Sequence, residues 1–201
     1  MLLVGLTGGL ATGKSFVGQE LQKLGCHLIQ ADELGHQVLL PGGDAYEAVV
    51  AEFGKEILNE AGEIDRRKLG SLVFGDPERL ARLNAIVHPA VRRKEREIAA
   101  AIAAREPDAI VVVEAAILVE TGSYGRFDKL IVVVCGREQQ IERAMKRSGL
   151  SRAEVESRLN RQLADEEKVK FADFVIDTSQ SKAHTAEETR LVYEALRRVS
   201  R

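Results

Sequence analysis

The stretch "GLTGGLATGKS", residues 5–15, constrains the fold of this chain more than any other part of the sequence. It directly follows the apolar residues "MLLV" and matches the pattern G-x-x-x-x-G-K-[ST] from Gly8 to Ser15. Glycines let a backbone curl until consecutive N–H groups point inward, and a helix that begins there adds the positive end of its dipole. The pattern therefore predicts a short strand, a phosphate-binding loop and a helix, in that order.

The residue types at the end of this loop indicate a ligand with several phosphates. Lys14 can reach the β and γ phosphates of a nucleotide as a point charge. The Ser15 hydroxyl can ligate Mg²⁺, which bridges the same phosphates. The alternative is a glycine-rich turn that merely precedes a helix. We expect the nucleotide, with Mg²⁺, to contact Gly9, Leu10, Ala11, Thr12, Gly13, Lys14, Ser15 and Phe16.

Short apolar runs alternate with helical patterns along the rest of the chain. The runs at 2–6, 27–30, 109–115, 129–134 and 173–177 predict five strands. Several are continuous β-branched runs, which are typical of strands buried on both faces of a parallel sheet. Helical spacing at the start and end of the chain predicts helices near 15–24 and 183–198. The fold class is therefore α/β, a five-stranded parallel sheet with helices on both faces and the phosphate loop at the end of its first strand.

The text between the second and third predicted strands is helical throughout. We expect helices at 32–40, 44–53, 66–74, 77–87 and 89–105, with His88-Pro89 starting the last one because proline suits a first turn. We expect these helices to form an insertion at 33–106, and residues 141–164 to form a helical lid. The chain then reads as a single domain, 1–201, with its core at 1–32, 107–140 and 165–201.

Composition excludes several classes of protein. The net charge of -2 argues against a nucleic-acid-binding protein held by bulk charge. No apolar stretch approaches the length of a membrane span, and we expect neither a membrane partner nor a signal peptide. Cys26 and Cys135 are far apart and lie beside predicted strands, which indicates buried free thiols and a reducing cytoplasm.

Motifs absent from the sequence narrow the class of P-loop protein. There is no N-K-x-D guanine motif and no L-S-G-G-Q-like signature. The small size and the helical insertion favour a P-loop kinase for a small molecule. We expect ATP to be its donor and the insertion at 33–106 to bind its acceptor. Asp32 follows the second predicted strand, where a carboxylate can accept the proton of an attacking hydroxyl. It could equally cap the helix that follows, and the two roles can coexist.

A basic helical hairpin is predicted after the fourth strand. Arg143 and Arg147 are four residues apart on one helix face, Ser148-Gly149 breaks that helix, and Ser151 with Glu154 forms a capping box. Such a hairpin can close over the phosphates as a lid. The alternative is a pair of solvated helices linked by Glu–Arg bridges.

Nearly the whole chain resembles the dephospho-coenzyme A kinase family. The resemblance lies in "GLTGGLATGKS", "ADELGHQV", "GEIDRRKLGSLVF", "LNAIVHPAV", "FDKLIVVV", "QIERAMKR" and "ADFVID". It implies ATP-dependent phosphorylation of the ribose 3′-hydroxyl of dephospho-CoA to give CoA and ADP, the last step of CoA synthesis. The residue roles that it implies are Asp32 as base, Lys14 and Arg147 at the transferring phosphate, Arg143 at ATP, and Arg66, His88 and Leu118 beside the acceptor.

Some positions depart from the family pattern or leave two readings open. Gln30 stands where the family usually has Asp, and Thr178 where it usually has Asn, in a loop expected to border the adenine. The family usually has Pro-Leu-Leu where this chain has Ala-Ile-Leu at 116–118. Glu114 is either in the outer shell of Mg²⁺ or a surface acid at a strand end. Four apolar side chains of the insertion either wall a groove for the acceptor or form its core: Leu69, Val73, Leu83 and Ile86.

The assembly and the activity also have alternatives. We expect a monomer or a small homo-oligomer. A kinase for another small metabolite or a nucleoside monophosphate would share this sheet, and a nucleotide-binding regulator without transfer activity would share the loop.

Overall fold

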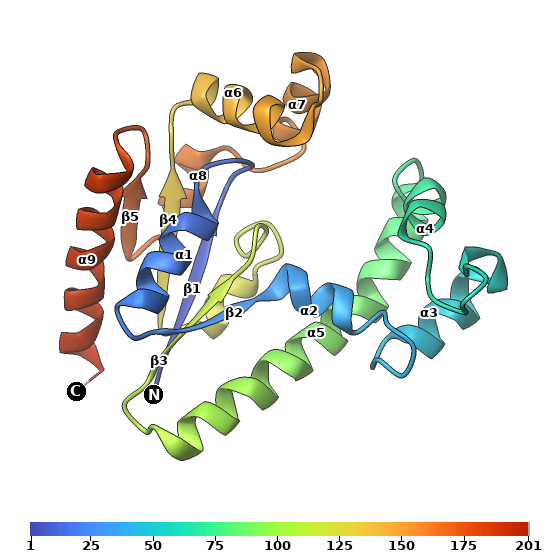
Figure 1. Ribbon diagram of the computed structural model, residues 1–201, viewed down its shortest axis with the longest axis horizontal. Coiled ribbons are helices and arrows are strands. Elements are labelled where there is room, and N and C mark those ends of the chain that lie inside the picture. Colours follow the sequence, from blue (N-terminus) through green and yellow to red (C-terminus); the bar gives the residue numbers. More distant parts are fainter. Residues whose placement is uncertain (201) are drawn as a thin grey trace. The chain divides into compact units, whose positions relative to one another are not determined.

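The computed structural model describes residues 1–200 of the chain. Contacts between residues divide it into two compact units. The sheet unit consists of Met1–Gln30 and the chain from Ile102 onward, and the helical unit is Ala31–Ala101. Figure 1 labels the α-helices and strands of both.

The sheet unit is built on five parallel strands in the order β2-β3-β1-β4-β5. They are β1 (Leu2–Gly8), β2 (His27–Gln30), β3 (Ile110–Glu114), β4 (Lys129–Val134) and β5 (Phe174–Asp177). Every residue of β3 is buried, as its run of β-branched side chains predicts for a sheet covered on both faces. The predicted parallel α/β sheet is therefore confirmed, and β1 lies at its centre.

Two sets of elements cover the two faces of this sheet. One face packs against α1 (Lys14–Lys23) and α9 (Lys182–Val199), which are in contact with each other. The cluster on this face comprises Leu2, Val4, Leu6, Val17, Leu21, Cys26, Ile110, Val112, Ile131, Val133, Ile176 and Leu196. On the other face, Leu130 and Val132 pack with the segment after β3, which includes η2 (Ser123–Arg126), and with Val169 of α8 (Asp165–Val169).

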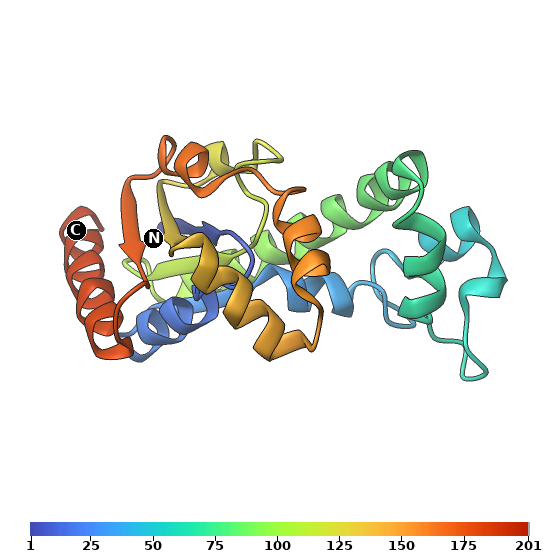
Figure 2. The ribbon, with the colours of Figure 1, turned by 90° about the horizontal axis from the view of Figure 1, so that it is seen from above.

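After β4 the sheet unit carries a helical hairpin of α6 (Arg137–Ser148) and α7 (Arg152–Leu159), visible in Figures 1 and 2. Gly149 ends α6 in the left-handed conformation, with φ 68°. Ser151 and Glu154 cap α7 reciprocally. The predicted helix break and capping box are both confirmed.

The helical unit contains α2 (Ala31–Gln37), α3 (Tyr46–Phe53), η1 (Lys55–Ile57), α4 (Arg66–Val73) and most of α5 (Pro77–Arg105). The predicted helix start at His88-Pro89 is wrong, because α5 continues through Pro89. Proline inside a helix removes one hydrogen bond and costs about 3 kcal/mol. The burial of Ala90 and Val91, immediately after it, favours an unbroken helix.

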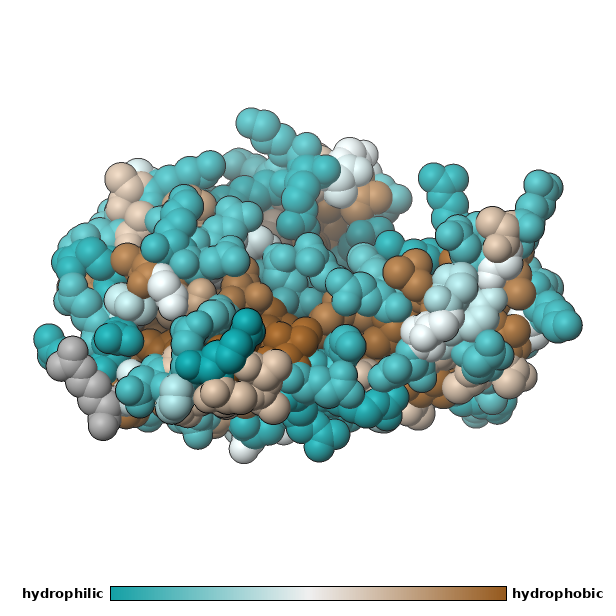
Figure 3. Space-filling view, turned by 60° about the horizontal axis from the view of Figure 1, so that its bottom comes forward, coloured by the Kyte–Doolittle hydropathy of each residue, from teal (hydrophilic) through white to brown (hydrophobic). Residues whose placement is uncertain are grey.

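The surface and the thiols agree with the composition. Figure 3 shows one face covered mainly by hydrophilic residues. Within residues 1–200, no helix combines the length and apolar character that crossing a membrane requires. Cys26 and Cys135 are buried free thiols, as predicted, and burial raises the pKa of Cys26 to about 12.

Candidate active site

The phosphate loop connects the end of β1 to the start of α1 at the carboxyl edge of the sheet. Gly8 is a steric requirement, because a Cβ there would lie 2.2 Å from the backbone oxygen of Val133 in β4. Gly13, with φ 97°, occupies the N-cap of α1 in the left-handed region. Two glycines therefore let the chain turn tightly from a central strand into a helix whose first N–H groups can bind an anion.

The lysine and serine of the loop contact its two sides. Lys14 Nζ donates hydrogen bonds to the carbonyl oxygens of Gly8, at 2.7 Å, and Gly9, at 2.8 Å. The Ser15 hydroxyl donates to Glu114 Oε1 at 2.8 Å, and Gln30 Nε2 lies 3.4 Å from the other oxygen of Glu114. Lys14 thus folds over the loop, while Ser15 joins α1 to the carboxyl end of β3.

Glu114 is only 8% exposed, so its reading as a surface acid is wrong. A serine hydroxyl beside a buried carboxylate is a set of hard oxygen donors, which suits Mg²⁺. Across residues 1–200 no cluster of three His, Cys, Asp or Glu side chains could hold a metal by itself. The residues present fit a magnesium ion that takes part of its ligands from a bound nucleotide.

Side chains from α6, α8 and the segment between α7 and α8 contact the first half of the loop. The Leu10 N–H donates to Gln162 Oε1 at 2.8 Å, and Gln140 Nε2 donates to Asp165 Oδ2, also at 2.8 Å. A Cβ on Gly9 would lie 2.8 Å from Gln140 Nε2 and 2.9 Å from Asp165 Oδ1. Burial raises the pKa of Asp165, against the Lys168 ammonium and a hydrogen bond from the Gly9 backbone, which lower it.

The tip of the loop lies in the apolar core of the helical hairpin. Leu10 and Ala11 pack against a buried cluster from α6 and α7 that consists of Ile141, Ala144, Val155 and Leu159. Ala11 has a φ of 59°, the one positive value outside glycine among residues 1–200. The hairpin is thus seated on the phosphate loop, as its predicted role requires, and its closure as a lid stays a prediction.

The two arginines of α6 differ in their surroundings. Arg143 donates to Thr178 Oγ1 at 2.9 Å and to the Thr178 carbonyl oxygen at 2.7 Å. Thr178 in turn donates its hydroxyl to the Thr12 carbonyl oxygen at 2.6 Å. Arg143 therefore ties the loop after β5 to the phosphate loop, and its predicted contact with ATP is untested. Arg147 is exposed. Phe16, whose contact with the nucleotide was also predicted, is in α1, and the Lys182 ammonium of α9 lies 5.7 Å from the centre of its ring.

The three site residues predicted in the helical unit lie on three different helices, α2, α4 and α5. Asp32 is exposed and is the second residue of α2, so the reading that it caps this helix is wrong. Arg66 is exposed and is the first residue of α4, whose N-cap is Asp65. His88 is half-buried in α5, and burial together with Arg92 lowers its pKa.

Several apolar residues predicted beside the acceptor are core residues. Leu118 is 3% exposed and belongs to the cluster on the β4 face of the sheet unit. In the helical unit, Leu69 and Val73 are buried, at 4% and 1% exposure, whereas Leu83 and Ile86 are half-buried. Little of Leu118, Leu69 or Val73 is available to a ligand.

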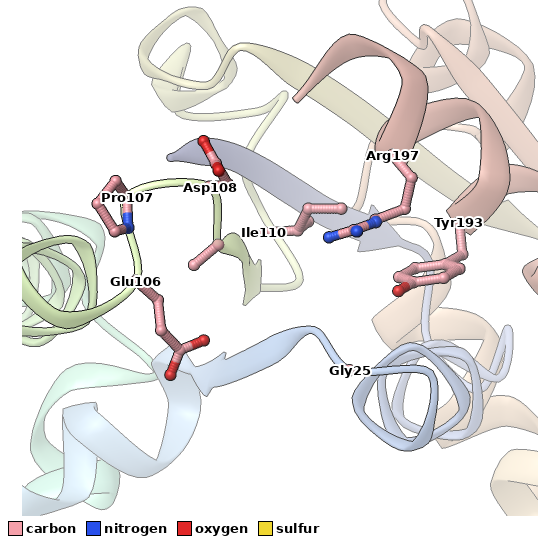
Figure 4. Close-up of a pocket in the computed structure, with 8 residues that line it drawn as sticks. Gly25, Glu106, Pro107, Asp108, Ile110, Tyr193 and Arg197 are labelled. Carbon is pink, nitrogen blue, oxygen red and sulfur yellow. The ribbon is translucent and has the colours of Figure 1, made fainter. Parts of the chain in front are cut away.

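A separate hollow of about 230 Å³ lies at the opposite, amino edge of the sheet (Figure 4). Residues before β2 and β3 line it together with Tyr193 and Arg197 of α9. In Figure 4, Glu106 and Asp108 stand on the chain leading into β3, across from Arg197. The hollow shares no residue with the phosphate loop and is not part of this site.

Together, the parallel sheet and the lysine-bearing glycine loop define a P-loop kinase. Shikimate kinase from Bacteroides thetaiotaomicron shares this fold, with a TM-score of 0.52 at 14% identity, covering 97% of this chain and 98% of that one. The model of the family described as Dephospho-CoA kinase matches residues 2–184, and the chain belongs to this family.

Individual relatives cover nearly the whole chain. The dephospho-CoA kinase of Aquifex aeolicus is 43% identical over 198 residues, which are 98% of this chain and 99% of the relative. A crystal structure of a Thermus thermophilus protein is similar with a TM-score of 0.84, at 34% identity and 96% coverage of both chains. The dephospho-CoA kinase from Campylobacter jejuni has a TM-score of 0.64 at 29% identity, again with 96% coverage of both.

Proposed function

We propose that this protein transfers the γ-phosphoryl group of ATP to the ribose 3′-hydroxyl of dephospho-CoA, giving CoA and ADP. The observation that carries the proposal is the match to the dephospho-CoA kinase family over residues 2–184. The buried free thiols fit a reducing cytoplasm, where the reaction is proposed to occur.

The sheet unit supplies the donor side of the reaction. The backbone N–H groups at the start of α1 bind the phosphates, and Lys14 exchanges its loop carbonyls for phosphate oxygens. Ser15 and Glu114, which are hydrogen-bonded to each other, would hold Mg²⁺ with their oxygen atoms. When bound, the ion neutralises charge that builds up on the β and γ phosphates during transfer. Arg147 and Arg143 of α6 add positive charge there.

The helical unit supplies the acceptor side. Asp32 takes the proton of the attacking hydroxyl, a role supported by its position two residues after the end of β2. Arg66 binds the acceptor's pyrophosphate. His88 makes a further contact, as a neutral donor or acceptor, because its pKa is lowered.

The test offers Mg-ATP with dephospho-CoA, AMP, adenosine or shikimate and identifies each product by mass and by loss of the free 3′-hydroxyl. We expect dephospho-CoA to be phosphorylated far better than the others. Lys14→Met is the inactive control, since removing one charge-stabilising donor costs about 10²–10³ in rate. Preferred phosphorylation of another acceptor, or of another hydroxyl, would overturn the proposal.

A further inference from the structure

We propose that Asp165 is a positioning residue for the phosphate loop, acting with Gln140 and Gln162 as a polar clasp on Gly9 and Leu10. The proposal rests on the proposed function, because it concerns how the same loop is prepared for ATP. The clasp is defined here as the side chains of these three residues.

The clasp contacts the first half of the loop. Gln162 Oε1 accepts from the Leu10 N–H at 2.8 Å, and Asp165 Oδ1 lies beside Gly9, 2.9 Å from where a Cβ on that glycine would be. Fixing these two peptides fixes the direction in which the chain enters the turn at Ala11. The second half of the loop, which leads into α1, keeps its N–H groups for an anion.

Gln140 holds the Asp165 carboxylate, and an ion pair anchors the short helix that carries it. Gln140, only 5% exposed, donates to the second oxygen of this carboxylate at 2.8 Å. Lys168, one turn further along α8, is fully buried and lies 2.7 Å from Glu120 in the segment after β3. A helix as short as α8, with five residues, has little stability of its own, so these contacts fix where it presents Asp165.

A carboxylate this close to a phosphate site has an electrostatic cost, since it repels the ligand. Its benefit is the geometry of the loop. The left-handed Ala11 costs of order 1–3 kcal/mol and persists only where its surroundings hold it. Ala11 directly follows Gly9 and Leu10, which the clasp contacts, and it packs in the hairpin core. Donors that are already in place need no reorganisation when the phosphates arrive or react.

The first experiment measures ATP affinity by titration without any acceptor, together with kcat, KM and the melting temperature. Asp165→Asn replaces one carboxylate oxygen by a donor, so that either Gln140 loses its acceptor or the oxygen beside Gly9 is lost. We expect ATP affinity to fall about tenfold, the loss of one hydrogen bond to a charged group. The matched control is Glu166→Gln, an exposed acid next to it on α8, which should leave ATP affinity unchanged.

A second pair of variants isolates the Leu10 contact. Gln162→Met keeps the length of the side chain but loses the acceptor, whereas Gln162→Glu keeps an acceptor. We expect Gln162→Met to weaken ATP binding and Gln162→Glu to recover part of the affinity, because the acceptor returns but the added charge repels the phosphates. If both Asp165→Asn and Gln162→Met lower the melting temperature but leave ATP affinity and kcat as in the wild type, the clasp is only structural and the proposal is wrong.

These results are separable from the proposed function. ATP affinity tests the clasp even if dephospho-CoA proves not to be the acceptor. A wild-type chain that binds no ATP would overturn both.

Discussion

At the scale of single residues, the phosphate loop depends on neighbours that its motif does not contain. Glu114 belongs to β3, yet it accepts the hydrogen bond of the Ser15 hydroxyl and lies 3.3 Å from where a Cβ on Gly18 would be. Gly18 therefore leaves room for this carboxylate beside α1. β3, which pairs with β1, thus supplies a carboxylate beside the hydroxyl of Ser15.

Asp32 can be tested without disturbing a helix cap, because it lies inside the first turn of α2. Asp32→Asn removes a base but keeps size and polarity, and the lost interaction with the helix dipole is worth only about 0.3–1 kcal/mol. We expect turnover to fall roughly 10² to 10⁴-fold, the usual contribution of general-base catalysis. Steady-state kinetics and denaturant unfolding measure the two effects. A loss below about threefold would mean that the base is elsewhere.

His88 predicts a pH dependence of stability. Its pKa is lowered from 6.5 in the folded chain, chiefly by burial and then by Arg92. Near and below pH 6.5, His88 therefore binds more protons in the unfolded state than in the folded state. The contribution of neutral His88 to the free energy of unfolding is then lost as the pH falls. Between pH 7.5 and 5.5, a range of about two pH units around the ordinary histidine pKa, we expect the free energy of unfolding to fall less in His88→Gln than in the wild type. Parallel unfolding-free-energy curves would contradict this.

At the scale of elements, α8 depends on a buried ion pair. Lys168 has no well-aligned hydrogen-bond acceptor within residues 1–200, and its ion-pair partner Glu120 is 19% exposed at the side chain. Lys168→Met leaves that carboxylate without its cation, and we expect the free energy of unfolding to fall by about 3 kcal/mol.

Two further variants make the test specific to burial. Adding Glu120→Gln to Lys168→Met should restore most of the loss, because no charge then remains uncompensated. Lys170→Met, which breaks the exposed pair with Glu167, should change stability by less than about 1 kcal/mol. A double variant as unstable as Lys168→Met alone would show that packing, not charge, holds α8.

The helical hairpin predicts a difference between binding and turnover. Arg147 is exposed on α6, whereas the loop tip is already fixed in the hairpin core. If Arg147 meets the transferring phosphate chiefly on closure, Arg147→Ala should lower kcat by about 10²-fold and ATP affinity far less. Lys146→Ala, its exposed neighbour, is the control. Equal losses in affinity and kcat would make Arg147 a ground-state contact.

Sequence patterns anticipated the elements better than the contacts between them. The β-branched runs of β3 and β4 predict buried parallel strands because burial on both faces is a property of each strand alone. The prediction that a helix starts at Pro89 was wrong. Proline disfavours a helix interior by about 3 kcal/mol, but α5 continues through it and the next two residues are buried. Gln140 and Asp165 are 25 positions apart, so their contact with Gly9 depends on tertiary structure. The sequence offered a weak signal, since Gln140 shares the apolar face of α6 with Ile141 and Ala144.

At the scale of the whole molecule, the chain is proposed to bind its two substrates through different units. The phosphate loop and the residues that support it all belong to the sheet unit. Arg66 and His88 belong to the helical unit, which has its own buried core around Val49, Ile57, Leu69 and Val73. A substitution at the surface of the helical unit should therefore change the KM of the acceptor and leave the KM of ATP unchanged.

Arg66→Ala tests this division. Arg66 is exposed at the first position of α4, where the helix dipole adds to its charge and favours an anion. We expect the KM of dephospho-CoA to rise about tenfold, as for one lost charge-assisted hydrogen bond, with little change in the KM of ATP. Arg67→Ala is the matched control, since Arg67 is the next residue, equally charged and exposed. A joint rise in both KM values, or an equal effect of Arg67→Ala, would show a general loss of positive charge. The assignment of Arg66 to the acceptor would then be wrong.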